Sequence, residues 1–203
     1  PGPFAWDWRP PTLILEAPLW APDRLIGHLP GNHRLTVIEQ DRRSVLAVDA
    51  AAFDVAFVQP TPAEEKDAPA VATKIHGEGL TLAADQGPAA KLGGFDAVLT
   101  AYNPADPDHT TETYDLDATL TGLTLPNEPP PALGRDVARV LVRAAVMGRV
   151  PPAALPAQSL ALWRDDGGTI EARRLELDYG PLEVRGEGTL ALDRALQPVG
   201  ALT

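Results

Sequence analysis

The clearest pattern of apolar and polar positions lies in residues 162–200, near the C-terminus. Apolar side chains recur at every second position on both sides of Gly180-Pro181. A period of two predicts strands, and a two-residue break that contains glycine predicts a tight turn between them. These residues are therefore predicted to form a β-hairpin, whose apolar face carries Leu175, Leu177, Tyr179, Leu182, Val184, Leu190 and Leu192.

Two changes in the phase of this alternation predict β-bulges. One falls across Arg173-Arg174, between the apolar positions at Ala172 and Leu175. The other falls beside Gly122, in a strand predicted over residues 110–125. Bulges bend a strand and increase its twist, so both positions favour a curved sheet. The apolar face of the 110–125 strand carries Tyr114, Leu116, Ala118 and Leu120.

Weaker alternation predicts further strands between proline- and glycine-rich turns. Residues 1–11 are expected to be an extended lead-in, and the alanines at 50–52 leave a short helix as an alternative to a break between two strands. Residues 59–69 are polar and proline-rich, which predicts a flexible surface loop. The expected strands are 12–16, 34–39, 44–58 on either side of the alanines, 71–84 and 90–102.

Two segments show helical features instead. Residues 132–148 carry an apolar stripe at helical spacing and end at Gly148, before Pro151-Pro152, which predicts an amphipathic helix. A shorter helical turn is expected over 157–164. The predicted fold is thus mainly β: a long curved antiparallel sheet of hairpins, with the 132–148 helix packed on its apolar face as a plug or lid.

Composition limits the function classes. A chain of 203 residues is expected to form one β-rich domain, since its 22 prolines and 17 glycines disfavour long helices. A net charge of −11 disfavours nucleic acid as a partner, because the phosphate backbone would be repelled. The chain lacks cysteine, which excludes disulfides, and it has no apolar run long enough for a membrane span. Because it starts at Pro1 rather than methionine, an upstream signal or anchor segment is expected.

No arrangement of residues indicates catalysis. The four histidines are scattered, and His28 and His33 are expected to be surface turn residues rather than metal ligands. Asp165-Asp166 precedes two glycines, a pattern more typical of a solvated turn than of a catalytic carboxylate pair. We therefore expect a protein without enzymatic activity, cofactor or metal. A hydrolase that uses Asp165 or Asp166 is the third-ranked alternative.

Three arginines recur at a spacing of four, at Arg135, Arg139 and Arg143. They could bind phosphate headgroups or an acidic partner. Alternatively they could form ion pairs within the chain, in particular with Asp115 and Asp117 if a neighbouring sheet edge carries them. For the tryptophans, Trp6, Trp8, Trp20 and Trp163, packing in the core is favoured over a ligand groove or a membrane boundary.

The C-terminal half resembles one bacterial family. The motifs that carry the resemblance are Leu162-Trp163-Arg164, Gly167-Gly168, residues 175–182, Gly186-Glu187-Gly188-Thr189-Leu190, Leu192-Asp193 and Pro198-Val199-Gly200. Trp20-Ala21-Pro22 and residues 29–33 extend it to the N-terminal half. The family is catalogued as domain of unknown function 2125, and Tyr179 stands where it usually has tryptophan. A fainter similarity links the glycine-rich strands to the AsmA-like and secretion-system protein N families.

The resemblance implies a location and a general shape rather than an activity. Members of the family are envelope proteins with an N-terminal membrane segment and an exported β-rich body. The chain is accordingly expected in the periplasm, anchored to the inner membrane through a segment upstream of Pro1.

Two functions fit these observations. The first is binding of a lipid or another apolar molecule between sheet and helix, with Leu175, Leu177, Leu190, Leu192, Tyr114 and Leu116 as ligand-binding residues. The second is a structural or interaction subunit that pairs with an envelope protein through a sheet edge. Strict alternation of apolar and polar side chains along residues 175–179 also predicts the effect of two substitutions. Leu177→Asp should abolish folding or ligand retention, whereas Glu176→Lys on the opposite face should be tolerated.

Overall fold

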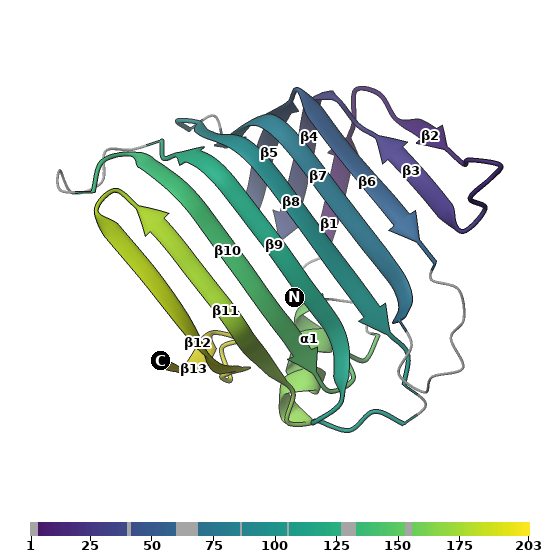
Figure 1. Cartoon of the computed structure of the whole chain (residues 1–203), viewed down its shortest axis with the longest axis vertical. Helices are drawn as coiled ribbons and strands as arrows, with labels where there is room; N and C mark the ends of the chain where they lie inside the picture. Colours follow the sequence, from purple (N-terminus) through teal and green to yellow (C-terminus); the bar gives the residue numbers. More distant parts are fainter. Residues whose placement is uncertain are drawn as a thin grey trace.

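The computed structural model describes residues 4–39, 42–59, 69–85, 87–104, 106–126, 133–152 and 156–203. Within these ranges the chain forms thirteen strands in one antiparallel sheet and one short helix (Figure 1). No helix in this part of the chain has the length and apolarity that crossing a membrane requires. The predicted loop at 59–69 lies almost wholly outside the described residues.

The strands follow the alternation of the sequence closely in the central region. In chain order they are β1 (Phe4–Arg9), β2 (Ile14–Glu16), β3 (Arg24–His28), β4 (Gly31–Glu39), β5 (Arg42–Ala50), β6 (Ala52–Val58), β7 (Pro69–Ala84), β8 (Ala90–Tyr102), β9 (Glu112–Thr124), β10 (Asp136–Met147), β11 (Thr169–Tyr179), β12 (Leu182–Leu192) and β13 (Pro198–Leu202), with the helix α1 (Pro156–Asp165) between β10 and β11.

The sheet has a main path and a branch. The main path runs β1-β4-β5-β7-β8-β9-β10-β11-β12-β13, and β2, β3 and β6 form a branch that also ends on β7. β5 pairs with the C-terminal part of β7 and β6 with its N-terminal part, so that one long strand supports both. Ala51 marks the separation of β5 from β6, which confirms two strands around the alanines rather than a helix.

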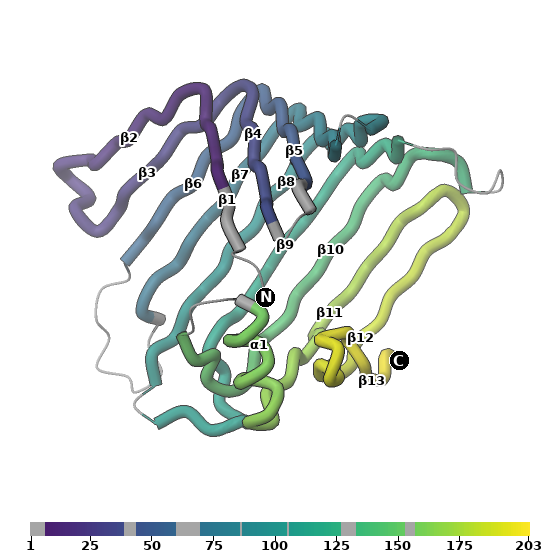
Figure 2. The backbone as a smooth tube through the Cα atoms, turned by 180° about the vertical axis from the view of Figure 1, so that it is seen from behind, coloured from purple at the N-terminus to yellow at the C-terminus, as the bar shows by residue number. Residues whose placement is uncertain are grey.

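A line of unpaired positions crosses the central strands where this separation occurs. The pairing registers skip Gly79 in β7, Gly93 in β8, Gly122 in β9 and Ala138 in β10. Gly79 and Gly122 have φ angles of 58° and 63°, a conformation that glycine adopts at little cost. Irregular pairing at the same level of adjacent strands lets the sheet bend there. Accordingly, β1, β4 and β5 lie over one face of the central strands (Figure 2).

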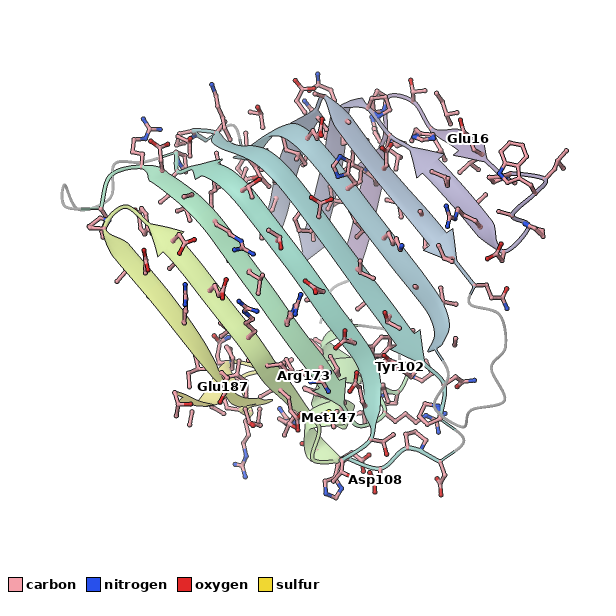
Figure 3. All side chains as sticks on the ribbon, in the orientation of Figure 1. Glu16, Tyr102, Asp108, Met147, Arg173 and Glu187 are labelled. Carbon is pink, nitrogen blue, oxygen red and sulfur yellow. The ribbon has the colours of Figure 1, made fainter. Side chains whose placement is uncertain are left out.

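The two faces of the sheet differ in chemistry. We call the face covered by β1, β4 and β5 the apolar face; across β6 to β11 its register rows join Phe53, Phe95, Leu120, Val140 and Leu177, and Leu99, Leu116, Ala144 and Ala172. The opposite face, the polar face, carries a row of Asp54, His76, Asp96 and Thr119. Figure 3 shows the side chains of the sheet from this face. The buried core is small and centres on Ala50, Leu80 and Leu92, next to the line of unpaired positions.

Both predicted bulges are confirmed. The pairing of β11 with β12 shifts between Ala172 and Leu175, and Gly122 lets Leu120 and Leu123 both pack against the core cluster despite their odd spacing. The turn at Gly180, with φ of 55°, joins β11 to β12 as predicted.

The predicted 132–148 helix is wrong. Residues Asp136–Met147 form β10, paired on one side with β9 and on the other with β11. Four valines lie in this segment, and β-branched residues favour strands once partner strands are available on both sides. The helix that does form is α1, close to the short turn expected at 157–164. Among the described residues no long helix covers the apolar face; β1, β4 and β5 cover part of it instead.

Candidate apolar groove

A groove lined almost entirely by apolar side chains lies on the inside of the bend. One wall comes from Phe53, Phe95 and Leu120 on β6, β8 and β9, below the line of glycines. The other wall comes from β1, β4 and β5 and from the parts of β7 and β8 on the other side of that line. The groove has a volume of about 580 Å³, and its remaining lining residues are Trp8, His33, Leu35, Leu46, Val48, Leu80, Leu82 and Leu92.

His33 is the one ionisable side chain in this lining, and it is buried. Its Nε2–H donates to the carbonyl oxygen of Leu29 at 2.6 Å, so this ring nitrogen has its partner inside the protein. The ring stacks on Trp8, with centroids 6.0 Å apart, and meets Phe53 edge-on. The imidazole thus acts as an aromatic wall element, and the expectation of a surface turn residue is wrong for His33.

The predicted ligand-binding residues share the apolar face but lie outside the lining of the groove. The pairing registers join Tyr114 through Val146 and Ile170 to Leu190, while Leu175 and Leu177 face Val142 and Val140. Leu116 and Leu192 belong to the same face by alternation. These half-buried side chains form an open apolar surface that continues from the groove towards β12.

The three predicted headgroup arginines lie on β10 and at its start, and each has a partner within the chain. Arg143 contacts Asp117 at 2.8 Å, and Arg139 approaches Glu176 at 3.6 Å. Arg135 donates to the carbonyl oxygens of Leu125 and Pro126. The contact between Arg143 and Asp117 is an ion pair between neighbouring strands, which is the alternative to headgroup binding that the sequence left open.

A row of alternating histidines and aspartates crosses the polar face, which sequence reasoning missed. His28, Asp54, His76 and Asp96 are cross-strand partners on β3, β6, β7 and β8. Nδ1 of His28 lies 2.7 Å from Asp54, and Nδ1 of His76 lies 2.7 Å from Asp96. Glu16 and Glu78 face the other ring nitrogens at 3.6 and 3.4 Å. The row depends on registers between strands far apart in sequence, so spacing alone could not reveal it.

These contacts make stability depend on pH in a defined direction. The hydrogen bond to Asp54 raises the pKa of His28 above 6.5, and the bond to Asp96 does the same for His76. A raised pKa in the folded state stabilises the protein fully below pH 6.5, and this contribution is lost as pH rises through the folded-state pKa. We expect the unfolding free energy to fall from pH 6.5 upward, as measured by urea titration. Asp54→Asn with Asp96→Asn should flatten this slope; an unchanged slope would contradict the assignment.

The remaining sequence candidates lie in different parts of the fold. Asp165 and Asp166 lie exposed at the end of α1, and Asp165 bonds Arg164. Trp163 is buried, which confirms core packing for that residue, whereas Trp20 is 89% exposed and Trp8 lines the groove, so core packing is wrong for these two. The Trp6 side chain lies outside the described part. The alternation of Phe53, Val55 and Phe57 is visible in the sequence of β6, but the opposing wall of the groove depends on the bend.

Comparison with protein families gives a match over nearly the whole chain. A family model described as "Uncharacterized protein conserved in bacteria (DUF2125)" matches residues 3–203. No curated protein and no solved structure is significantly similar to the chain.

Proposed function

Because the chain belongs to the family of uncharacterized bacterial proteins described as DUF2125, whose description names no activity, we propose a function from the groove itself: binding of an acyl chain or a comparable apolar molecule. The observation that supports this proposal is the lining of the groove. Ten of its eleven side chains are aliphatic or aromatic, and the eleventh, His33, already donates to a backbone carbonyl.

The size of the groove suits such a ligand. Small-molecule sites commonly have volumes of a few hundred Å³ and a mainly apolar lining, and about 580 Å³ falls in that range. Each methylene group moved from water into an apolar environment contributes about 0.8 kcal/mol. An extended hydrocarbon chain would therefore gain affinity with length as it fills the space between Phe95 and Leu46.

The apolar face offers a continuation for a ligand longer than the groove. Leu25, Phe57, Val71 and Leu99 lie on this face at 38–47% exposure. Large apolar side chains grouped on one face at such exposure are typical of binding surfaces. The sequence-predicted residues Tyr114 and Leu116 lie beside them on β9. An envelope location, periplasmic and membrane-anchored, completes the proposal and rests on the family resemblance described above.

The test compares two neighbouring residues that face opposite ways on β9. Leu120→Trp should fill the groove and weaken binding of a fluorescent fatty acid by about tenfold, equivalent to about 1.4 kcal/mol. Thr119→Trp, on the polar face, should leave the affinity unchanged. Mass spectrometry of an organic extract of the purified wild type should find lipid that Leu120→Trp lacks. Equal fatty acid affinity in both variants, or a wild type without bound lipid and without affinity, would remove the proposal.

The second candidate is a subunit that pairs through the sheet edge. β13 pairs with Gly188–Leu192 of β12, and among the described residues no strand covers the edge at Leu182–Gly186. An open edge can accept a strand from a partner. Purification of the protein in a stable stoichiometric complex that Val184→Pro abolishes would favour this function.

A further inference from the structure

The tip of the β2–β3 hairpin carries the most exposed apolar side chains among the described residues. Leu19 is 94% exposed and Trp20 is 89% exposed. Both lie in the turn Ala17-Pro18-Leu19-Trp20-Ala21-Pro22, which joins the two strands. The hairpin forms the end of the β2-β3-β6 branch and projects from the sheet at the upper right of Figure 1.

We propose that this tip inserts into the interfacial region of a phospholipid bilayer. The inference rests on the proposed function, since it names the source from which the groove would take its apolar ligand. It also gives a role to two exposed apolar side chains that would otherwise favour aggregation.

The backbone of the tip exposes a reduced number of N–H donors. Pro18 and Pro22 have no N–H group, which removes two donors that would lose water on insertion. Two further donors are satisfied internally: Ala21 donates to Pro18 at 3.0 Å, and Arg24 donates to Ala21 at 3.1 Å. The backbone groups of Leu19 and Trp20 have no internal partner among the described residues, so the apex suits the hydrated headgroup region rather than the hydrocarbon centre.

Charges limit how deeply the tip can enter. Residues 17–22 contain no charged side chain, whereas Glu16 lies at one end of this stretch and Asp23 and Arg24 lie at the other. A short uncharged apex bounded by charges fits the headgroup boundary rather than the hydrocarbon centre, and tryptophan prefers that boundary. With a net charge of −11 and two carboxylates beside the tip, zwitterionic lipids fit better than anionic ones.

An apolar path connects the tip with the groove. Leu13 and Leu15 lie over Gly27 on the apolar face of the hairpin, where a Cβ atom on Gly27 would be 3.6 Å from each. Leu25 pairs with Phe57 on the next strand, and Val55 and Phe53 follow along β6. Phe53 lines the groove. A chain that leaves the bilayer at the tip would thus meet apolar side chains along its whole route.

A bilayer explains this surface better than a protein partner does. A stable protein interface commonly buries about 800 Å² on each side, with a complementary shape. Two large side chains on a narrow convex tip offer little of that area, whereas a fluid lipid surface needs no complementary shape. A protein partner is therefore an outcome of the test rather than the proposal.

The experiment measures sedimentation of the full chain with vesicles of phosphatidylcholine. The variant is Leu19→Ser with Trp20→Ser. The matched control is Leu160→Ser with Leu162→Ser on α1, which removes two apolar side chains that are 40% and 47% exposed. We expect the tip variant to bind at least about tenfold more weakly than wild type, and the control to bind equally. Brominated lipid should quench a component of the fluorescence that Trp20→Phe removes.

Salt and lipid charge separate this mechanism from electrostatic adsorption. Binding through the tip should change little between low and high salt and should not require phosphatidylglycerol. Wild type that ignores phosphatidylcholine vesicles, binds them only when anionic lipid is added, or binds no better than the tip variant would overturn the inference.

The failure of this inference can be told from failure of the proposed function. Fatty acid binding in free solution should be intact in the tip variant, because Leu19 and Trp20 are outside the groove lining. Leu120→Trp should show the reverse, with normal vesicle binding and weakened fatty acid binding. Loss of both properties in either the tip variant or Leu120→Trp would contradict the assignment of tip and groove as separate sites.

Discussion

Replacing Trp163 by alanine is expected to lower the unfolding free energy by about 3–5 kcal/mol, the range typical of large aromatic residues in cores. Trp163 is the largest fully buried side chain among the described residues, at 2% exposure. It lies on α1, and its Nε1–H donates to the carbonyl oxygen of Met147 at 2.8 Å. The side chain thus ties the helix to the end of β10.

The surroundings of Trp163 are shaped to accept it. Gly148 and Gly168 lie next to each other beside the indole, where β10 ends and β11 is about to start, and a Cβ atom on Gly168 would overlap the ring. Because the backbone approaches the ring so closely, loss of the indole would leave a cavity that the neighbouring strands cannot readily close.

Urea denaturation of matched variants checks this expectation. Trp163→Phe keeps most of the ring volume but leaves the Met147 carbonyl without its donor, so a loss of about 1–3 kcal/mol is expected. Leu162→Ala, at an adjacent position that is 47% exposed, should change stability little. A Trp163→Ala variant as stable as Leu162→Ala would show that α1 does not anchor the fold.

Local patterns were sufficient to predict most strands, because the alternation of apolar side chains reports which face of a sheet is buried. The β11–β12 hairpin and the bulges at Gly122 and at Arg173-Arg174 could be predicted in this way. In each case the signal lies within one strand or between neighbours joined by a short turn. The mainly β fold class followed from the same signal.

β10 shows where local pattern is ambiguous. Val137, Val140, Leu141 and Ala144 fit one side of a helix, but the same segment fits a strand once Ala138 is allowed to bulge. The decision depends on β9 and β11, whose pairing supplies hydrogen bonds and apolar contacts on both edges. A single sequence does not contain that information in the segment itself.

The groove could not be predicted for a related reason. Gly79 and Gly93 carry no signal of their own, and Gly122 predicts only a bulge in its own strand. The three form a line because the registers of β7, β8 and β9 place them side by side. The bend brings His33 from β4 against Phe53 from β6, which the sequence separates by twenty positions. Residues of the open apolar face were accessible to pattern analysis, whereas residues of the enclosed groove required the topology.

Glu176→Lys is expected to destabilise the protein strongly, although strict alternation predicts that this substitution is tolerated. Glu176 does lie on the polar face, opposite Leu177, but its side chain is only 8% exposed. Arg174 bonds it at 2.6 Å, and Arg139 lies 3.6 Å away. The long arginine side chains cover the carboxylate, so a polar face need not be a solvated one.

The electrostatic reason is that this carboxylate is surrounded by positive charge. The hydrogen bond from Arg174 lowers the pKa of Glu176, and Arg139 and Arg185 act in the same direction. A folded-state pKa below 4.5 means that the contribution is present at neutral pH and is lost on acidification. A lysine at position 176 would place a fourth positive charge among three arginines and remove the group that holds them together.

Thermal and urea unfolding at pH 7 test the role of Glu176 with three comparisons. Glu176→Gln should be milder than Glu176→Lys, because it removes the negative charge without adding a positive one. Glu183→Lys, at an exposed position on β12, should have little effect. Adding Arg174→Glu to Glu176→Lys should restore part of the lost stability by reversing the pair, as expected of residues in direct contact. If Glu176→Lys is instead as stable as Glu183→Lys, the ion pairs with Arg174 and Arg139 contribute nothing, and side-chain alternation alone decides which positions of β11 tolerate charge.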